Sequence, residues 1–276
     1  MRTTSNPLVS IVTVCLNSEK HIEQAMKSVL NQTYENIEYL IIDGGSKDKT
    51  LKIIKKYENH LKYWVSEPDK GLYDALNKGI LHASGNIIGI LHSDDWYPER
   101  AVELVVKEYL KDKKAGVFLG DIMLVTKNGN FIRVNGTPEL IGSYRWKNIN
   151  HPTCFIKREI YQKYKYDLNF KVCSDFNLFL KLYFNGVKFH YLNEILVYWR
   201  SGGISSSYTT LLENYRIRKK YFGNRVFILL EFLGGLAKRF LVKTVFRGDL
   251  NNRLLKWLRK RKRAKKERLP QPSASQ

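Results

Sequence analysis

The chain has 276 residues, of which 43% are hydrophobic and 13% aromatic, and its formal net charge is +21. These values exclude a disordered chain, and the length accommodates one large folded domain with an appendage. Of the net charge, +15 lies between residues 209 and 268, where 19 Lys and Arg stand against 4 Asp and Glu, and +6 lies on the rest. This C-terminal excess predicts an anionic partner, either a membrane surface or a nucleic acid.

The first hundred residues alternate short apolar runs with helical patterns. Strands are predicted at Leu8–Cys15, Glu38–Ile42, Tyr63–Val65 and Ile87–Leu91. Helices are predicted from Asn17-Ser18 to Asn31, over Asp48–Asn59 and over Gly71–Ala83. Asn17-Ser18 and Ser46 are the expected N-caps of the first two helices. The alternation predicts an α/β fold with a mostly parallel, doubly wound sheet.

The middle of the chain is less regular. Helices are predicted over Pro98–Leu110 and Asp175–Phe184. Strands are predicted at Val117–Leu119, Met123–Val125, Phe131–Val134, Pro152–Ile156, Val187–Tyr191 and Ile195–Tyr198. Asn128-Gly129 indicates a hairpin turn. The Gly- and Ser-rich run Ser201–Ser207 is expected to be a linker or a loop that closes over a ligand.

The C-terminal residues differ in kind from the rest. Val226–Phe246 is aliphatic but charged at four positions, and its charge-poor part is too short to span a bilayer. Leu250, Leu254, Leu255 and Leu258 share a helical face before the basic run Arg259–Lys266. The predicted organisation is an α/β domain over residues 1–208, a basic amphipathic helical region over 209–268 and a disordered tail over 269–276.

The cysteines and the N-terminus indicate the cellular compartment in which the protein is expected. Cys15, Cys154 and Cys173 are far apart and show no CxxC spacing, so they indicate neither a disulfide framework nor a zinc site and favour a reducing cytosol. The apolar run after MRTTSNP is short and lacks a small-residue cleavage site, so it is predicted to be a strand and not a signal peptide.

Two adjacent acids, Asp94 and Asp95, directly follow the predicted strand at Ile87–Leu91. Open α/β sheets bind ligands at the carboxyl ends of their strands. Paired carboxylates at such a place hold Mg²⁺ or Mn²⁺, which prefer oxygen ligands and share substrate phosphates. The alternative is an acidic strand-to-helix turn, in which Asp95 favours the helix dipole.

Three further acids are candidates for chemistry. Asp43 ends the second strand, where its carboxylate could accept hydrogen bonds from a nucleotide base or ribose, or could form the turn before Gly44-Gly45. Asp69-Lys70 could contact ribose and pyrophosphate, or form a solvated ion pair. Asp175 starts a predicted helix and could be an N-cap or first-turn acid.

Six sequence pieces resemble family-2 glycosyltransferases of the GT-A fold, of the bacterial kind that build polysaccharides from nucleotide-sugars. The pieces are PLVSIVTVCLN, LNQTYENIEYLIIDGGSKDKT, SEPDKGLYDALNKGI, GNIIGILHSDDWY, HPTCFIKRE and SDFNLFLKL. They occur in the family's order and span roughly Pro7–Ser207. DKGLYDALNKGI resembles a subgroup linked to exopolysaccharide, capsule and O-antigen assembly.

The resemblance implies an inverting, metal-dependent transfer of a sugar from a nucleotide-sugar, with a UDP-sugar expected, to a glycan or polyprenyl-diphosphate-linked acceptor. It makes Asp95 the ligand of Mn²⁺ or Mg²⁺ and Asp175 the general base that deprotonates the acceptor hydroxyl. It places these residues at the nucleotide-sugar: Leu16, Asn17, Asp43, Asp69, Lys70, Asp94, His151 and Arg200. Many family members have a second acid where this chain has Gly44, which leaves open the group that contacts the base.

Two of these assignments have alternatives. His151 could touch phosphate, metal or acceptor, or be a neutral histidine that orients a loop. Arg200 and Ser205 could reach the pyrophosphate when the Gly- and Ser-rich loop closes.

The aliphatic and basic C-terminal pattern predicts a place for the enzyme in the cell. It is expected on the inner face of the plasma membrane, held peripherally by its basic region on anionic lipid, where the resemblance implies a lipid-linked acceptor. The alternative is a soluble helical pair that packs on the catalytic domain or serves self-association.

Two other classes of protein are alternatives to this interpretation of the sequence. A nucleic-acid-binding protein on a nucleotide-binding α/β domain would use the basic tail, but that tail has a broad aliphatic face instead of exposed stacking aromatics, so no nucleic-acid partner is expected. A nucleotide-sugar pyrophosphorylase-like enzyme would need a glycine-rich phosphate loop after the first strand, which this sequence lacks.

Overall fold

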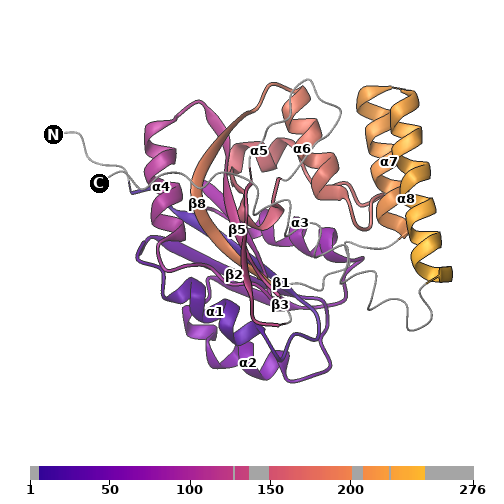
Figure 1. Ribbon diagram of the computed structural model, residues 1–276. Coiled ribbons are helices and arrows are strands. Elements are labelled where there is room, and N and C mark those ends of the chain that lie inside the picture. The colour runs from indigo at the N-terminus through magenta and orange to yellow at the C-terminus, as the bar shows by residue number, and fades with distance from the viewer. Residues whose placement is uncertain (1–5, 127, 137–148, 201–207, 224, 246–276) are drawn as a thin grey trace, which may run out of the picture. The chain divides into compact units, whose positions relative to one another are not determined.

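The computed structural model of the chain describes residues 6–126, 128–136, 149–200, 208–223 and 225–245 (Figure 1). The chain divides into two compact units, Met1–Ile217 and Arg218–Gln276. The division falls inside helix α7 (Tyr208–Phe222), and the domain boundary placed after residue 208 stays a prediction.

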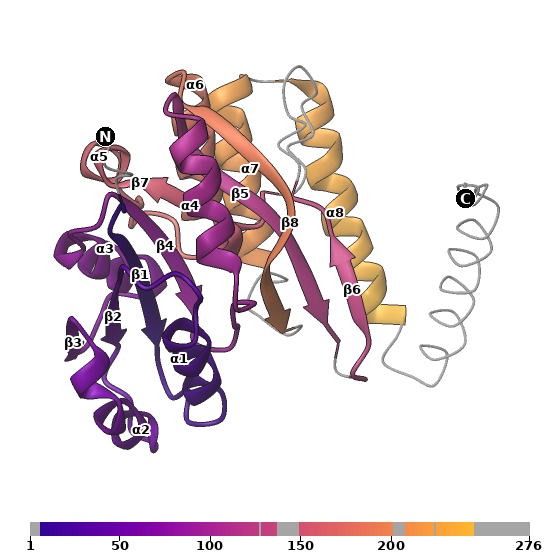
Figure 2. The same ribbon diagram turned by 90° about the vertical axis from the view of Figure 1, so that its left-hand side faces the viewer.

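Four parallel strands form one half of the sheet in the first unit. They are β1 (Val9–Cys15), β2 (Ile37–Asp43), β3 (Tyr63–Ser66) and β4 (Ile87–His92), in the order β3-β2-β1-β4. Cys15 pairs with Asp43, and Asp43 with Ser66, so the carboxyl ends of these strands are level. Figure 2 shows β1, β2 and β4 running in the same direction. The predicted doubly wound arrangement is confirmed.

Antiparallel pairs continue the sheet beyond β4. The strands are β7 (Phe155–Lys157), β5 (Ala115–Val125) and β6 (Phe131–Val134), and β8 (Lys188–Arg200) runs parallel to β5. The sequence predicted two separate strands in place of β5 and two in place of β8. Register shifts beside Asp121 interrupt the period-two pattern along both strands, which explains the split. The predicted strand at Pro152 begins later, at Phe155, because His151–Thr153 form a 3₁₀ turn, η2.

Helices cover both faces of the sheet. They are α1 (Ile22–Leu30), α2 (Thr50–Lys56), α3 (Leu72–His82), α4 (Ala101–Lys111), α5 (Arg158–Lys163) and α6 (Ser174–Phe184), with a 3₁₀ turn η1 at Glu58–His60. Figure 1 shows α1, α2 and α4 on one face and α3, α5 and α6 on the other. Helix α5 was not predicted.

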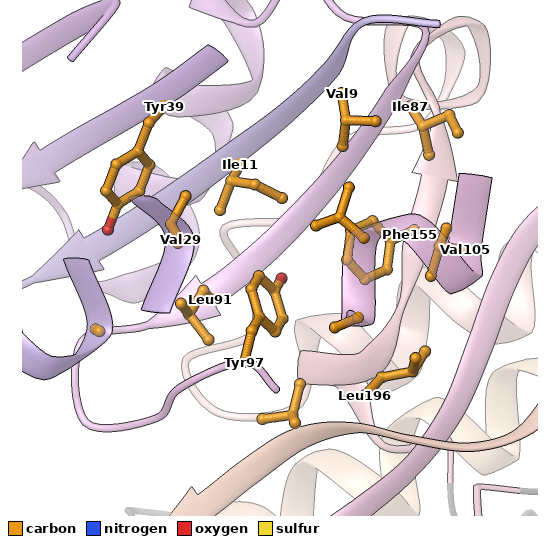
Figure 3. Packing of buried hydrophobic residues seen from close by; sticks show 14 of the residues in the cluster. Val9, Ile11, Val29, Tyr39, Ile87, Leu91, Tyr97, Val105, Phe155 and Leu196 are labelled. Carbon is orange, nitrogen blue, oxygen red and sulfur yellow. The ribbon is translucent and has the colours of Figure 1, made fainter. Parts of the chain in front are cut away.

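The core between the sheet and helices α1, α2 and α4 is apolar and closely packed (Figure 3). Val9 and Ile11 of β1, Leu91 of β4 and Val105 of α4 are all 0% exposed. On the opposite face, α3 lies so near the sheet that a Cβ at Gly79 would collide with the side chain of Val12. Burial of these side chains fixes the strands, and therefore the loops at their carboxyl ends.

The predicted side-chain N-caps of α1 and α2 are wrong. These helices begin after His21 and Lys49, and neither has a side-chain cap. Asn17 has a left-handed backbone with φ +51°, and its N–H donates to Ser46 Oγ at 2.7 Å. The polar residues expected to cap helices instead tie the loop after β1 to the loop after β2.

The second unit contains α8 (Val226–Val245). Within it, Arg218 Nη1 donates to Glu231 Oε2 of α8 at 2.5 Å. Among the helices in the described part of the chain, none is both long enough and apolar enough to cross a membrane. The predicted helical face at Leu250–Leu258, the basic run Arg259–Lys266 and the tail after residue 268 lie outside the described residues.

Candidate active site

Loops at the carboxyl ends of β1, β2, β3 and β4 lie at one edge of the sheet and carry most of the predicted donor-site residues. Ser18 Oγ and Ser93 Oγ are 2.8 Å apart, which links the loop after β1 to the loop after β4. Asn17 Oδ1 accepts a hydrogen bond from Lys47 N–H at 2.9 Å. Leu16 is 56% exposed at this edge. Hydrogen bonds between loops therefore hold the edge in one arrangement.

Asp43 anchors the turn after β2. Its Oδ2 accepts hydrogen bonds from Gly45 N–H, Ser46 N–H and Ser66 Oγ–H, and its Oδ1 accepts them from Ser46 Oγ–H and Cys15 Sγ–H. Burial favours a higher pKa for this carboxyl, but the hydrogen bonds led by Ser46 and Ser66 lower the pKa overall. Asp43 is 0% exposed, as expected for the turn-forming alternative; a direct contact with the nucleotide stays a prediction.

Asp69 occupies the space above Gly44. A Cβ built on Gly44 would lie 2.5 Å from Asp69 Oδ2 and 3.5 Å from Leu16 Cδ1. Asp69 Oδ1 accepts a hydrogen bond from Gly71 N–H at 2.7 Å. A carboxylate from the loop after β3 thus lies beside Gly44. Lys70 is exposed beside it.

Asp95 is the best candidate for a metal ligand. It is 1% exposed, its Oδ1 accepts a hydrogen bond from Arg200 N–H at 3.1 Å, and its Oδ2 is buried without a hydrogen-bond partner in the described structure. Burial, with the nearby charge of Asp94, raises the pKa of Asp95 well above its ordinary value. A buried carboxylate oxygen without a partner is costly unless a cation satisfies it.

The donor set fits a divalent cation that shares substrate phosphates. Asp94 and Asp95 are adjacent, and among the residues that the structure describes there is no group of three or more His, Cys, Asp or Glu that could hold a metal. Mg²⁺ and similar ions are commonly held by one or two carboxylates, with phosphate oxygens completing the coordination. The residues present therefore fit Mn²⁺ or Mg²⁺.

Arg200, at the end of β8, braces the acidic loop. Its Nη1 donates to Asp94 O at 2.7 Å and its Nη2 to Gln24 Oε1 at 2.5 Å. The guanidinium carbon lies 4.4 Å from the ring centroid of Trp96, which stacks on Tyr198. The predicted contact with pyrophosphate stays a prediction, and its suggested partner Ser205 is outside the described residues.

Asp175 lies in the first turn of α6, whose N-cap is Cys173, so of the two structural alternatives the first-turn acid is confirmed and the N-cap is not. Asp175 Oδ1 lies 3.0 Å from Tyr73 Oη and accepts a hydrogen bond from Phe176 N–H at 2.8 Å. Burial raises the pKa of Asp175 above its ordinary value despite these hydrogen bonds. A carboxylate with a raised pKa is a stronger base, which suits proton abstraction near neutral pH.

His92 and His151 are neighbours, and their ring centroids are 5.6 Å apart. Burial lowers the pKa of each to about 4, so both are neutral at physiological pH. His151 is 6% exposed, and its Nε2 lies 2.7 Å from the hydroxyl of Tyr166. These contacts are those of the neutral, loop-orienting alternative; contact with substrate stays a prediction.

His92 and Tyr73 were missed by the sequence reasoning. Burial is the main cause that lowers the pKa of His92, and the charges of Asp94 and Asp175 both oppose it, so this ring lies near both acids. The available signal was position, because His92 is the last residue of β4 and Tyr73 lies in the piece DKGLYDALNKGI.

The sheet and its edge are those of an α/β enzyme with paired carboxylates at the carboxyl ends of its strands. Residues 10–181 match the model of the family described as glycosyl transferase family 2, and the chain therefore belongs to glycosyltransferase family 2. The expected enzyme class is confirmed.

Two relatives illustrate the range of similarity. The chain is 41% identical over 111 residues to an uncharacterised glycosyltransferase of Mycobacterium tuberculosis, which covers 40% of this chain and 42% of that protein. It is 33% identical over 202 residues to chondroitin synthase of Pasteurella multocida, which covers 68% of this chain and 20% of that protein. The chain spans less than half the length of each of these relatives.

Solved structures confirm the predicted GT-A fold. S. aureus TarS 1–349 in complex with UDP has a TM-score of 0.62 at 20% identity, over 82% of this chain and 70% of that one. The mannosyltransferase PcManGT from Pyrobaculum calidifontis, in complex with GDP-Man and Mn²⁺, has a TM-score of 0.62 at 16% identity, over 91% of this chain and 79% of that one.

Proposed function

We propose that this glycosyltransferase moves a sugar from a UDP-sugar to a hydroxyl of a glycan acceptor, with inversion and with a divalent metal, in the synthesis of a bacterial surface polysaccharide. The observation that carries the proposal is the buried Oδ2 of Asp95 at the strand ends, which has no hydrogen-bond partner among the residues that the structure describes. The UDP complex of TarS and the name chondroitin synthase support the donor and the product class.

The donor diphosphate lies at the carboxyl edge of the sheet, beside Asp94 and Asp95. Mn²⁺ or Mg²⁺ held by Asp95, with Asp94 adjacent, would supply Lewis-acid neutralisation of the leaving diphosphate. Arg200 keeps the acidic loop in place through the carbonyl of Asp94 and the carboxylate of Asp95. Its guanidinium adds positive charge at the same edge.

Asp175 takes the proton of the acceptor hydroxyl as that oxygen attacks the anomeric carbon. Attack from the side opposite the diphosphate forms the new glycosidic bond, breaks the bond to the diphosphate and inverts the anomeric centre. Tyr73 orients Asp175, and burial raises the pKa of Tyr73 well above its ordinary value, so its hydroxyl remains a hydrogen-bond donor.

A donor screen tests the proposed reaction. The purified chain is incubated with UDP-, GDP- and dTDP-sugars, in Mn²⁺ or in EDTA, and nucleoside diphosphate release is followed. We expect release from a UDP-sugar in Mn²⁺ and at least about tenfold less in EDTA, because a bound metal stabilises the developing charge. Release from GDP-sugars alone would overturn the UDP assignment, and equal rates in EDTA would overturn the metal requirement.

The close approach of Asp69 to Gly44 gives a second prediction, which concerns the affinity for UDP. Gly44→Ala should weaken UDP binding by about tenfold, which is about 1.4 kcal/mol, because the added Cβ would meet Asp69 Oδ2 at 2.5 Å and displace that carboxylate. Titration calorimetry with UDP and Mn²⁺ measures the change. On an Asp69→Ala background the same substitution should have little further effect. Fully additive losses would show that Gly44→Ala does not act through Asp69.

We propose, in addition, that the C-terminal region rests on an anionic membrane surface, where a polyprenyl-diphosphate-linked acceptor is available. Among the described side chains of α8, the large apolar ones that are exposed are Val226, Leu229, Leu230 and Leu233. The basic run at residues 259–266 follows later in the chain. An apolar helix face and nearby basic residues together favour an interfacial position.

Vesicle flotation tests this membrane proposal. The full chain should float with vesicles that contain phosphatidylglycerol, and it should dissociate in high salt, since basic residues contribute on the order of 1 kcal/mol each at an anionic surface. A full-length variant with serine at the seven Lys and Arg of residues 259–266 should float much less. Flotation of the two proteins to the same extent would contradict the electrostatic attachment.

A further inference from the structure

Glu213 of α7 holds the segment that leads to the candidate base. Glu213 is 6% exposed. Its Oε1 accepts a hydrogen bond from Lys171 N–H at 2.8 Å, and its Oε2 accepts from Val172 N–H at 3.0 Å and Cys173 N–H at 2.9 Å. One carboxylate thus satisfies three consecutive backbone donors, and hydrogen bonds to a charged acceptor are stronger than neutral ones.

The held segment is connected to Asp175 in two ways. Cys173 is the N-cap of α6, and Asp175 lies in the first turn of that helix. The hydroxyl of Tyr73 lies 2.7 Å from the carbonyl oxygen of Val172 and 3.0 Å from Asp175 Oδ1. Its single proton is shared between two acceptors, so the position of the Val172 carbonyl affects how strongly Tyr73 donates to Asp175.

We propose that Glu213 is a positioning residue for catalysis, which fixes Lys171–Cys173 and thereby aims the Asp175 carboxylate at the acceptor hydroxyl. This inference rests on the proposed role of Asp175 as the base. It assigns a positioning role to a residue that lies after the Gly- and Ser-rich run, in the part of the chain whose sequence pattern indicated an anionic partner. Glu213 belongs to the first unit, with the residues it holds.

A matched pair of substitutions tests the proposal in the full chain. Glu213→Gln places an NH₂ group where one carboxylate oxygen accepts hydrogen bonds, so a donor then faces a donor. Because a displacement of about 1 Å from the reacting geometry can cost about 10²-fold in rate, we expect kcat to fall roughly 10- to 100-fold. The donor KM and the UDP affinity should stay within about twofold, because the donor groups lie on other elements.

Glu38→Gln is the control. Glu38 is 7% exposed near the start of β2, while Asp43 ends that strand, so Glu38 lies at the opposite edge of the sheet. Its Oε1 accepts hydrogen bonds from two backbone amides, Ser84 N–H at 2.5 Å and Gly85 N–H at 3.1 Å. We expect Glu38→Gln to lower Tm comparably and to leave kcat within about twofold of the unmutated enzyme.

The outcomes separate this inference from the proposed base. If Glu213→Gln lowers Tm like Glu38→Gln while kcat stays unchanged, the role is structural and the inference is wrong. A loss of kcat accompanied by an equal loss of UDP affinity also overturns it. If Asp175→Asn retains turnover, the base assignment fails and the inference fails with it. Should Glu213→Gln not fold, the same measurements on Glu213→Asp decide, because the shorter carboxylate should reproduce the selective loss of kcat to a smaller degree.

Discussion

Replacing Asp175 by Asn is expected to lower turnover by roughly 10²- to 10⁴-fold, the range over which general bases contribute. UDP affinity in Mn²⁺ should be nearly unchanged, because the base acts on the acceptor and not on the diphosphate. Steady-state rates with a saturating UDP-sugar, together with UDP calorimetry, give both quantities. Turnover near that of the unmutated enzyme would remove Asp175 from the mechanism, and a large loss of UDP affinity would move it to the donor site.

The same variant has a predicted effect on stability and on the pH profile. Burial raises the pKa of Asp175 in the folded state above its unfolded value, so its contribution to stability is fully present below the unfolded pKa and is lost as the pH rises through the folded pKa. Asp175→Asn should therefore leave Tm at neutral pH unchanged or higher. The acid limb of kcat should lie above the ordinary pKa of 3.8 and vanish in the variant.

Other titratable groups interact with Asp175 and set the background of that profile. They are Tyr73, His92, Cys154, Tyr166 and Cys173. Burial raises the pKa values of the tyrosines and cysteines, and it lowers the pKa of His92 to about 4. The tyrosines and cysteines therefore stay protonated and His92 stays neutral around pH 7. Burial also raises the pKa of Asp95, so the profile is measured in saturating Mn²⁺, where a bound cation keeps Asp95 ionised and Asp175 is the group expected to control the limb.

The sequence was informative where the physics is local. The alternation of buried strands and amphipathic helices predicted the parallel half of the sheet, and the position of Asp94-Asp95 after a buried strand predicted the edge at which they lie. Helix starts were less predictable, because Asn17 and Ser46 make bonds between loops that no local pattern reveals. The hydrogen bonds of Asp43 were unpredictable for the same reason, since its partner Ser66 belongs to another strand.

The remaining features depend on contacts between distant parts of the chain. Gln24 and Arg200 lie near opposite ends of the first unit in sequence, and they are hydrogen-bonded to each other at the site. Asp69 fills the space above Gly44 because two loops converge, which neither loop's composition indicates. Glu213 lies in a strongly basic stretch, and the local composition does not indicate a buried acceptor of three backbone amides.

Replacing Asp95 by Asn is expected to remove the effect of metal on the enzyme. In the unmutated chain, Mn²⁺ and UDP at about 100 times the dissociation constant should raise stability by about 2.7 kcal/mol, seen as a higher Tm. Asp95→Asn should lose most of this shift and should lower turnover by at least about 10²-fold, because a neutral amide is a poor ligand and a bound metal is worth several kcal/mol to the departing charge. Asp175→Asn, in contrast, should keep the shift.

Asp121→Asn is the matched control. Asp121 is also a buried acid, but both of its carboxylate oxygens accept hydrogen bonds. Its Oδ2 accepts a hydrogen bond from Arg133 Nε–H at 2.6 Å, and its Oδ1 accepts from Gly136 N–H at 2.9 Å and Tyr191 Oη–H at 2.7 Å. In EDTA, Asp121→Asn should lose about 1–3 kcal/mol of stability. Asp95→Asn should lose little or become more stable, since Asp95 Oδ2 has no hydrogen-bond partner in the described structure. An equal loss of stability in the two variants, with the Mn²⁺ shift retained in Asp95→Asn, would show that Asp95 is a structural acid and that the metal binds elsewhere.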